Sequence, residues 1–390
     1  MRIFITPAEP LLFRRTGRSF SAGEGGYADT LFPPTPETLQ GAIRAAIATR
    51  WDRTLTLAEV FEQKDLIDLI GSRTHYGRFR ITSMAVGRRD KDGAIERLFP
   101  APAFLQKDEA KNIVRLRPKQ LDDVRSNMPD EMQYLWSDAA VKGKLKPVGW
   151  LTESSLLKAL HGETLREEDI INEDVIRTFE PRLGIGMNNQ KKSTEEGLLY
   201  QTRMVRMNHT IESDYIYGFV VDVRLAQSSE GATATDQFID DSQTRELLRL
   251  TEEEAGWITL GGERRAARFE IIDLPEGGEA NRLERAKQGT VLYLATPAGF
   301  KEGWKPIDWQ PREWSHPLPT PVAAAIDRYQ SVGGWLLTPG SSGGENKPIL
   351  RCVPAGSVYF FNQPVTVTQP FTDHGWQIGY GIAYAGDWKQ

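Results

Sequence analysis

The pattern of apolar and polar residues predicts a chain of short strands with a few helices between them. Residues 2–13 form the first apolar run. Pro7 and Pro10 predict that this strand lies at a sheet edge or carries a bulge, because proline cannot donate to a neighbouring strand. Apolar residues then recur at helical spacing from Leu39 to Ile47, and Pro36 suits the first helical position. The sequence therefore predicts a strand followed by a helix with one buried face.

Hairpins are predicted on both sides of the middle of the chain. Residues 78–88 and 95–105 flank the turn Arg89–Gly93, and residues 179–207 contain a second hairpin-like unit with a polar tip. Further elements are predicted as a strand at 215–223, an acidic helix at 240–256, a strand at 289–300 and a glycine-punctuated strand at 376–386. The overall pattern indicates an α+β protein.

Length and composition restrict the class of protein. A chain of 390 residues is longer than a single hydrophobic core usually supports, so we predict two domains, 1–210 and 211–390. The sequence contains no run of eighteen apolar residues, so no membrane span is expected. The apolar run at the N-terminus is too short for a signal peptide. Cys352 is the only cysteine, which excludes an internal disulfide and a cysteine zinc site. These features fit a cytoplasmic protein.

Charge is unevenly distributed along the chain. The net charge is −5, yet residues 73–97 hold seven basic residues against three acidic ones, and residues 182–206 hold five against two. Local basic stretches allow an acidic protein to bind RNA along one face. The alternative is that these stretches are ordinary solvated surface.

A loop rich in arginine and glycine lies between the first strand and the first helix. Arginines in such a loop reach phosphates, and glycines allow the backbone to approach a bulky anion closely. The N-terminus of the helix at Pro36 adds a favourable field for an anion. The alternative is that the glycines only form turns and the arginines only cover the surface. The candidate residues of this loop are Arg14, Arg15, Arg18, Ser21, Gly23, Gly25 and Gly26.

These segments resemble one protein family in sequence. Phe13–Gly26 followed by Leu31–Arg44 resembles the N-terminus of the RAMP subunit of type III-B CRISPR (Cmr) complexes, whose members carry an "FFRDGRPFSAGEGG"-like loop and an "FPPSPxTLxGAxR"-like helix start. Leu183–Arg206 resembles the family's "GIxxDxxTxxxxEGxLYxxxxVR" hairpin, and Leu260–Arg265 its "LGGEGR" turn, with Arg264 where glycine is commoner. The run Gly379–Gly381 resembles the glycine-rich loop near the C-terminus of RAMP proteins.

The resemblance implies two tandem ferredoxin-like (RRM-like) domains with insertions. It also implies a non-catalytic subunit without cofactor or metal, which binds the 5′ tag of CRISPR RNA and docks the large polymerase-like subunit and the first backbone subunit. In the hairpin, Met187 would wedge beside a base and Tyr200 would stack, unless Tyr200 packs inward. The remaining RNA-binding candidates are Arg44, Lys191, Lys192, Arg203, Arg206 and Arg265.

The sequence offers little for catalysis. Its five histidines share no metal-ligand spacing, and it contains neither a P-loop nor a GxSxG motif. His75, near Tyr76 and several arginines, is the best candidate for a general base in RNA cleavage. Two alternatives therefore stay open: a RAMP endoribonuclease that processes precursor RNA, and a scaffold whose basic loops meet acidic protein surfaces.

Overall fold

The computed structural model describes most of the chain. The described residues are all except 15–25, 53, 55–56, 61, 73–74, 122–123, 125–128, 130–131, 189–190, 209–213, 230–236, 251–255, 262, 273–281, 313, 338–343 and 389–390.

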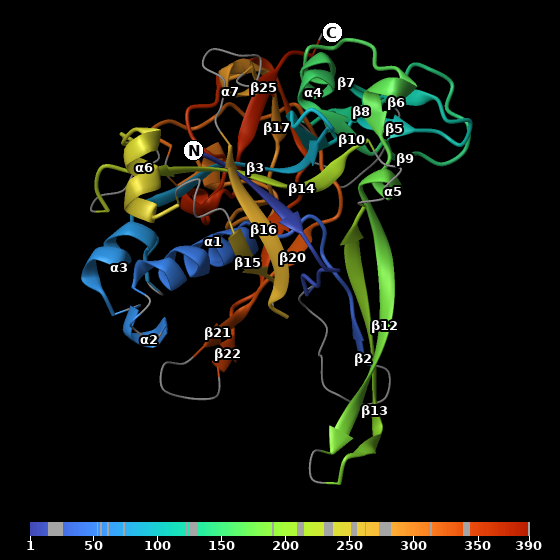
Figure 1. The fold of residues 1–390 in the computed structure, drawn as a ribbon. Helices are drawn as coiled ribbons and strands as arrows, with labels where there is room; N and C mark the ends of the chain where they lie inside the picture. The colour runs from blue at the N-terminus through green and yellow to red at the C-terminus, as the bar shows by residue number, and fades with distance from the viewer. Residues whose placement is uncertain are drawn as a thin grey trace.

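An eight-stranded antiparallel sheet forms the centre of the molecule, with the order β11-β10-β4-β3-β14-β1-β16-β15 (Figure 1). Its strands are β1 (Arg2–Pro7), β3 (Phe79–Arg89), β4 (Ile95–Pro100), β10 (Trp150–Thr152), β11 (Ile170–Ile171), β14 (Ile216–Leu225), β15 (Gly256–Leu260) and β16 (Arg265–Ile272). β3 and β4 form the first predicted hairpin, which is thereby confirmed.

β1 lies inside this sheet and its pairings show no bulge, so the prediction of an edge strand or a bulge was wrong, and the strand ends at Pro7 and not at residue 13. β1 pairs with β14 up to Ile5 and with β16 up to Pro7. Pro7 is therefore the last residue of the strand, at a position where β14 no longer pairs. A proline there leaves no ladder hydrogen bond to β14 unmade.

The helices are short except for α1, which begins at Pro36 as predicted. They are α1 (Pro36–Trp51), α2 (Leu57–Val60), α3 (Lys64–Ile70), α4 (Glu153–Leu160), α5 (Glu173–Ile176), α6 (Asp241–Leu248) and α7 (Arg282–Arg285), with 3-10 turns at Glu167–Asp169, Ile307–Trp309 and Trp376–Ile378. The predicted apolar face of α1, from Leu39 to Ile47, is buried. Asp240 caps α6 by accepting a hydrogen bond from the amide of Gln243 at 2.8 Å.

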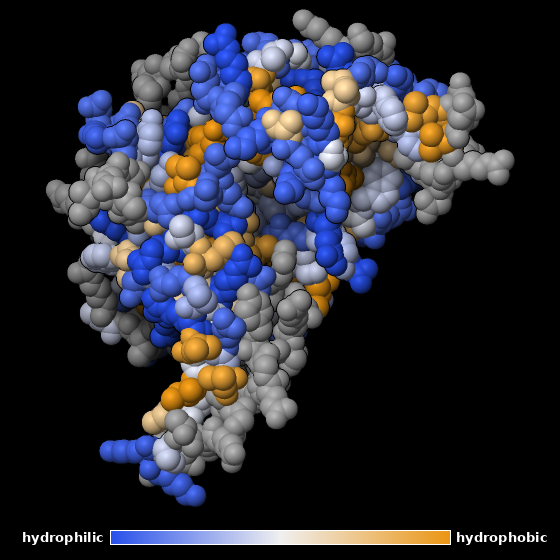
Figure 2. Space-filling view, turned by 90° about the vertical axis from the view of Figure 1, so that its right-hand side faces the viewer, coloured by the Kyte–Doolittle hydropathy of each residue, from blue (hydrophilic) through white to orange (hydrophobic). Residues whose placement is uncertain are grey.

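Smaller sheets surround the main one. Their strands are β2 (Gly26–Ala28), β12 (Arg177–Asn188) and β13 (Ser193–Met207); β17 (Gln288–Leu294), β19 (Ala323–Ala325), β24 (Val358–Thr366) and β25 (Ala383–Gly386); β18 (Ala298–Gly299), β20 (Gln330–Val332) and β23 (Leu350–Val353); β21 (Trp335–Leu337) and β22 (Gly344–Asn346); β5 (Leu105–Lys107), β6 (Ile113–Arg115) and β9 (Lys146–Pro147); and β7 (Arg117–Lys119) and β8 (Tyr134–Trp136). β12 and β13 form the second predicted hairpin, which projects from the body of the molecule (Figure 1, Figure 2).

The main sheet is covered on both faces. On one face Ile43 and Ile47 of α1 share a core with Ile5 and Val221. On the other face the sheet β19-β24-β17-β25 packs against it, for example where the rings of Phe99 and Tyr384 meet edge to face at 6.0 Å. The central strands β3 and β14 thus bury apolar side chains on both of their sides, whereas Trp257 and Thr259 of the edge strand β15 are exposed.

The structure contains many strands, few helices and several antiparallel sheets. It agrees with the prediction to the extent that α-helices and β-strands are both present. β14, β15 and β16 belong to the same sheet as β1, whereas the strands after Ile272, from β17 to β25, belong to other sheets. The predicted strand at 376–386 is a 3-10 turn followed by β25. The division into domains 1–210 and 211–390, and the ferredoxin-like character of each, remain predictions.

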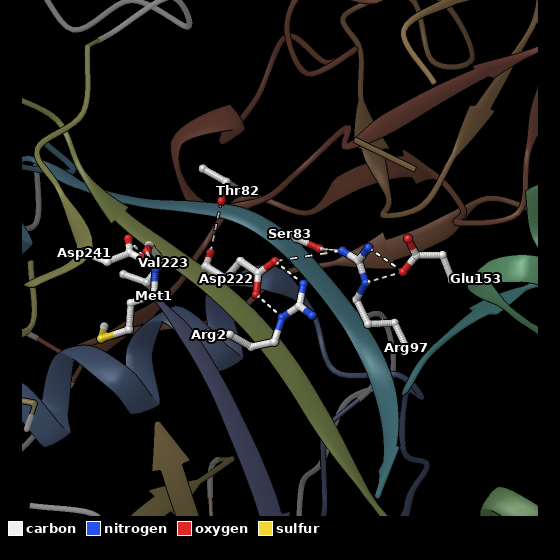
Figure 3. A network of polar contacts seen from close by, with 9 residues as sticks. All are labelled: Met1, Arg2, Thr82, Ser83, Arg97, Glu153, Asp222, Val223 and Asp241. Carbon is white, nitrogen blue, oxygen red and sulfur yellow. Dashed lines mark hydrogen bonds and ion pairs between the residues drawn. The ribbon is translucent and has the colours of Figure 1, made fainter. Parts of the chain in front are cut away.

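A buried ion network crosses the main sheet (Figure 3). Arg97 on β4 has a side chain that is 1% exposed, and its guanidinium donates to Glu153 at 2.6 Å and to Ser83 at 2.9 Å. Asp222 on β14 lies 3.9 Å from the same guanidinium and accepts two hydrogen bonds from Arg2, at 2.6 and 2.8 Å. The network therefore joins β1, β14, β3 and β4 to the first residue of α4.

Candidate nucleic-acid interface

The β12–β13 hairpin is paired from Arg177↔Met207 to Ile185↔Leu199, and an irregularity follows between Ile185 and Met187. β2 extends this ribbon by pairing in parallel with β13, with Gly26 opposite Tyr200. The chain just after the arginine- and glycine-rich loop is therefore a strand of the hairpin's own sheet.

Three segments that the sequence analysis singled out meet at the base of the hairpin. Leu11 exchanges backbone hydrogen bonds with Val205 at 2.7 and 2.8 Å. Gly261, in the turn after β15, has φ +77°, and a Cβ added there would lie 2.9 Å from the carbonyl oxygen of Leu12. The segment Leu11–Leu12 before the loop, the hairpin and the turn after β15 thus lie side by side. We call this region the hairpin base.

The arginines of the hairpin base are held by carboxylates and rings. The guanidinium of Arg203 lies 3.3 Å from the ring centroid of Phe179 and 3.7 Å from Asp29. Arg265 pairs with Glu263 at 2.9 Å. Arg14 is exposed where the described chain stops before the loop.

Glu180 on β12 holds two further arginines. Arg182 and Arg206 lie 2.6 and 2.7 Å from its carboxylate, and their hydrogen bonds, that of Arg182 foremost, lower the pKa of Glu180. Exposed ion pairs of this kind contribute little to stability, so a phosphate can replace the carboxylate at small cost. Arg182 was not among the predicted residues, although pairing Gly184 with Tyr200 places it on the same face as Arg206.

Tyr200 packs across the hairpin. Its ring occupies the space beside Gly184, where an added Cβ would lie 2.1 Å from the ring. This is the inward packing that the sequence analysis gave as the alternative. The other face of the half-buried ring remains the predicted stacking surface.

The tip of the hairpin carries Met187, Lys191 and Lys192, all of them exposed. Lys192 has φ +50° in the turn. The predicted residues Arg15, Arg18, Ser21, Gly23 and Gly25 lie outside the described residues, and Gly26 is the first residue of β2.

Arg44 makes an internal contact. Its Nη2 donates to the carbonyl oxygen of Gly71 at 2.8 Å, beyond the end of α3, and burial lowers the pKa of its guanidinium. In this structure Arg44 connects α1 to α3. Its role toward RNA remains a prediction.

The N-terminus of α1 already has an anion of its own. The carboxylate of Glu37 accepts a short hydrogen bond from the hydroxyl of Tyr380 and lies 3.8 Å from Nε2 of His374. Burial raises the pKa of Glu37, but its interactions with His374 and Tyr380 outweigh this, and the net effect is a pKa below 4.5. The predicted anion-binding end of α1 is therefore an attachment point for the C-terminal segment.

This attachment predicts a pH-dependent contribution to stability. A lowered carboxyl pKa stabilises the fold above pH 4.5, and the contribution disappears as the pH falls through the folded-state pKa. Glu37→Gln is expected to lower the free energy of unfolding by about 1.5–3 kcal/mol near pH 7, the range for a hydrogen bond to a charged group. Urea unfolding at pH 7 and again at a pH well below 4.5 measures this. A loss that stayed equally large in acid would contradict it.

His75, the predicted candidate for a general base, makes a local contact. Nδ1 of His75 accepts a hydrogen bond from the amide of Gly77 at 3.2 Å, within its own turn. No three His, Cys, Asp or Glu side chains cluster to hold a metal ion in the part of the chain that the structure describes. In that part, too, every helix is too short or too polar to span a membrane.

Comparison with known proteins places these features in context. Residues 3–388 match the model of a family described as "CRISPR-associated protein (Cas_Cmr3)". No curated protein matches the sequence. Among solved structures, the chain is similar to chains of Type III-B Cmr-beta bound to cognate target RNA, with and without AMPPnP. Both similarities are at 14% identity, covering 92% of this chain and 86% of the other, with TM-scores of 0.44 and 0.45. A chain of the apo state is similar at 11% identity, covering 70% and 96%, with a TM-score of 0.30.

Proposed function

Because the chain belongs to the Cas_Cmr3 family of CRISPR-associated proteins, we propose that it is a non-catalytic RNA-binding subunit of a type III-B CRISPR effector (Cmr) complex. In this proposal it binds the 5′ tag of CRISPR RNA and docks the large polymerase-like subunit and the first backbone subunit, in the cytoplasm. The observation that carries the proposal is the hairpin base, where three segments of the family's pattern meet.

At the hairpin base, phosphates of the RNA replace the carboxylates that now pair with the arginines. Arg203, Arg206 and Arg265 are each paired with a carboxylate at the surface, and a phosphate offers the same charge with more acceptor oxygens. Arg14 marks the start of the arginine- and glycine-rich loop, whose Arg15 and Arg18 complete the phosphate contacts. Such contacts position a nucleic acid without reading its sequence.

The tip of the hairpin and the ring of Tyr200 contact the bases of the RNA. Met187 separates neighbouring bases, Tyr200 stacks on one of them with its outer face, and Lys191 and Lys192 contact phosphates. The half-buried position of Tyr200 supports this, because a ring fixed on one side loses little freedom when a base covers the other.

Incubation with repeat-containing RNA separates this function from the nuclease alternative. We expect the purified chain to retain the RNA and to release no products, because His75 uses one ring nitrogen within its own turn and contacts no acid or base among the described residues. Gel analysis of labelled RNA, with the His75→Ala variant beside it, measures this. Specific cleavage that His75→Ala abolishes while the protein stays folded would establish the endoribonuclease instead.

Co-purification of RNA with the chain tests the scaffold alternative. If basic loops met only acidic protein surfaces, no protected RNA would co-purify with the chain after nuclease treatment. Recovery of a protected guide RNA favours the RNA-binding function.

A further inference from the structure

Rings and guanidinium groups alternate in a ladder at the hairpin base. The guanidinium carbon of Arg203, on β13, lies 3.3 Å from the ring centroid of Phe179, and that of Arg177 lies 4.0 Å from the same centroid. Two guanidinium groups so close to one centroid cannot share a face of the ring, so they lie on opposite faces. Arg177 also lies 4.9 Å from the ring centroid of Phe32. The order of the ladder is therefore Phe32, Arg177, Phe179 and Arg203.

The ladder begins in the core and ends in solvent. The ring of Phe32 meets that of Trp150 edge to face at 6.0 Å. The side chain of Arg177 is 9% exposed and pairs with Glu173 at 2.6 Å. The side chain of Arg203 is 38% exposed. Arg203 is therefore the end of the ladder that an outside molecule can reach.

The guanidinium plane of Arg203 is held in a fixed orientation. At 3.3 Å from the centroid it lies flat on the Phe179 ring, because an edge-on group would push a nitrogen into the ring. Asp29, at 3.7 Å, holds the edge of the same group. Guanidinium planes stack on nucleobases as well as on aromatic side chains. Little side-chain entropy is then lost when a base covers the outer face.

The neighbourhood of Arg203 favours RNA as the occupant. β2 runs beside β13 (Figure 1), and Asp29 follows directly after β2. The next residue, Thr30, pairs with Arg14, where the arginine- and glycine-rich loop begins. An RNA strand whose phosphates contact Arg14 therefore has its bases near the exposed end of the ladder. A cation attracts the π-face of a base, which strengthens the stack.

We infer that Arg203 is a stacking platform for one unpaired base of the RNA, and that Phe179 is the residue that positions it. The inference rests on the proposed function and deepens it, because the plane of Arg203 contacts a base while its edge stays available to a phosphate. Every base has a π-face, so the platform accepts any base at this position. Phe179 acts on the RNA only through Arg203.

Arg203→Lys tests the plane, because it keeps the positive charge and removes the stacking surface. We expect the affinity of the full chain for guide RNA to fall about tenfold, with an unchanged slope of log affinity against log salt. Undiminished affinity would show that Arg203 acts as a charge only. A flatter slope would assign it to phosphate contact alone. Either result would overturn the inference.

Arg249→Lys is the matched control for this substitution. Arg249 also lies over a ring, 4.5 Å from the centroid of Trp51, and it ends α6 on the far side of the molecule from the hairpin (Figure 1). We expect Arg249→Lys to keep the guide affinity of the unaltered chain. An equal loss in both variants would mean that the effect is not specific to the ladder, and would overturn the inference.

Guide RNA with a single missing base identifies the contact. An abasic nucleotide is placed at each position of the guide's 5′ segment in turn. We expect one position at which the missing base weakens binding to the unaltered chain about tenfold but does not weaken binding to Arg203→Lys further. Phe179→Leu, which removes the ring and keeps an apolar side chain, is expected to abolish the same sensitivity while the melting curve shows a folded protein.

The abasic series also separates the inference from the proposed function. Identical profiles for the unaltered chain and Arg203→Lys would overturn the platform. A folded Phe179→Leu variant with the profile of the unaltered chain would overturn the positioning role of Phe179. Failure of the unaltered chain to bind intact guide RNA would overturn the proposed function itself.

Discussion

Replacing Glu153 by leucine is expected to lower the free energy of unfolding by about 3–5 kcal/mol, because it removes the closest carboxylate from the buried, charged guanidinium of Arg97. The guanidinium of Arg97 donates to Glu153 through two nitrogens, at 2.6 and 3.0 Å (Figure 3). Ser83 is neutral, and Asp222, at 3.9 Å, is already bound by Arg2. Neither replaces the two hydrogen bonds that the carboxylate of Glu153 accepts from Arg97.

Urea unfolding measures this loss, provided that the slope against denaturant stays unchanged. The double variant Arg97→Met/Glu153→Leu removes both charges and is expected to recover most of the stability, as replaced buried pairs often do. Asp138→Asn is the matched control, since Lys119 and Asp138 form an exposed pair at 2.7 Å that contributes little. A loss from Glu153→Leu no larger than that of the control would show that the network is dispensable.

Replacing Arg14, Arg15 and Arg18 together by alanine is expected to weaken guide-RNA binding and to flatten its dependence on salt. Each phosphate contact on a single strand releases counterions, so three lost contacts reduce the slope of log affinity against log salt by about 2. Affinity measured at several salt concentrations gives this slope directly. An unchanged slope would reject the loop as a phosphate site.

A variant with the same change in net charge isolates the local contact. Lys119, Lys142 and Lys144 are exposed on the segment that carries β7 and β9. Their triple replacement by alanine removes three positive charges away from the hairpin base. We expect it to leave the salt slope nearly unchanged, and an equal effect of both triple variants would mean that only total charge matters.

Local patterns predicted the elements that local physics determines. The start of α1 at Pro36 and its buried face follow from a proline and a helical spacing, and both hairpins follow from apolar runs around polar turns. The position of β1 in the sheet could not be predicted in this way. Pro7 shows only that one backbone donor is missing, and it does not show which distant strands pair with β1. Pairing between residues 2 and 222 cannot be read from either segment alone.

The candidate site was predictable in position but not in its pairings. The hairpin and its tip stood out as a polar run between two strands, whereas the contacts of Glu180 with Arg182 and Arg206 depend on the cross-strand register. Arg44 looked free to turn outward because nothing in the sequence places Gly71 beside α1. The shared face of Leu183, Ile185 and Leu199 could not be predicted, because it depends on the cross-strand register.

The two ends of segment 15–25 are attached to one and the same strand. Leu11, just before the segment, is bonded to Val205, and Tyr27, just after it, is paired with Gln201. Ladder hydrogen bonds resist shear, so these two attachments and β13 behave as a single stiff bar. Because both attachments lie on β13, the separation between Leu11 and Tyr27 is set by the length of strand from Gln201 to Val205.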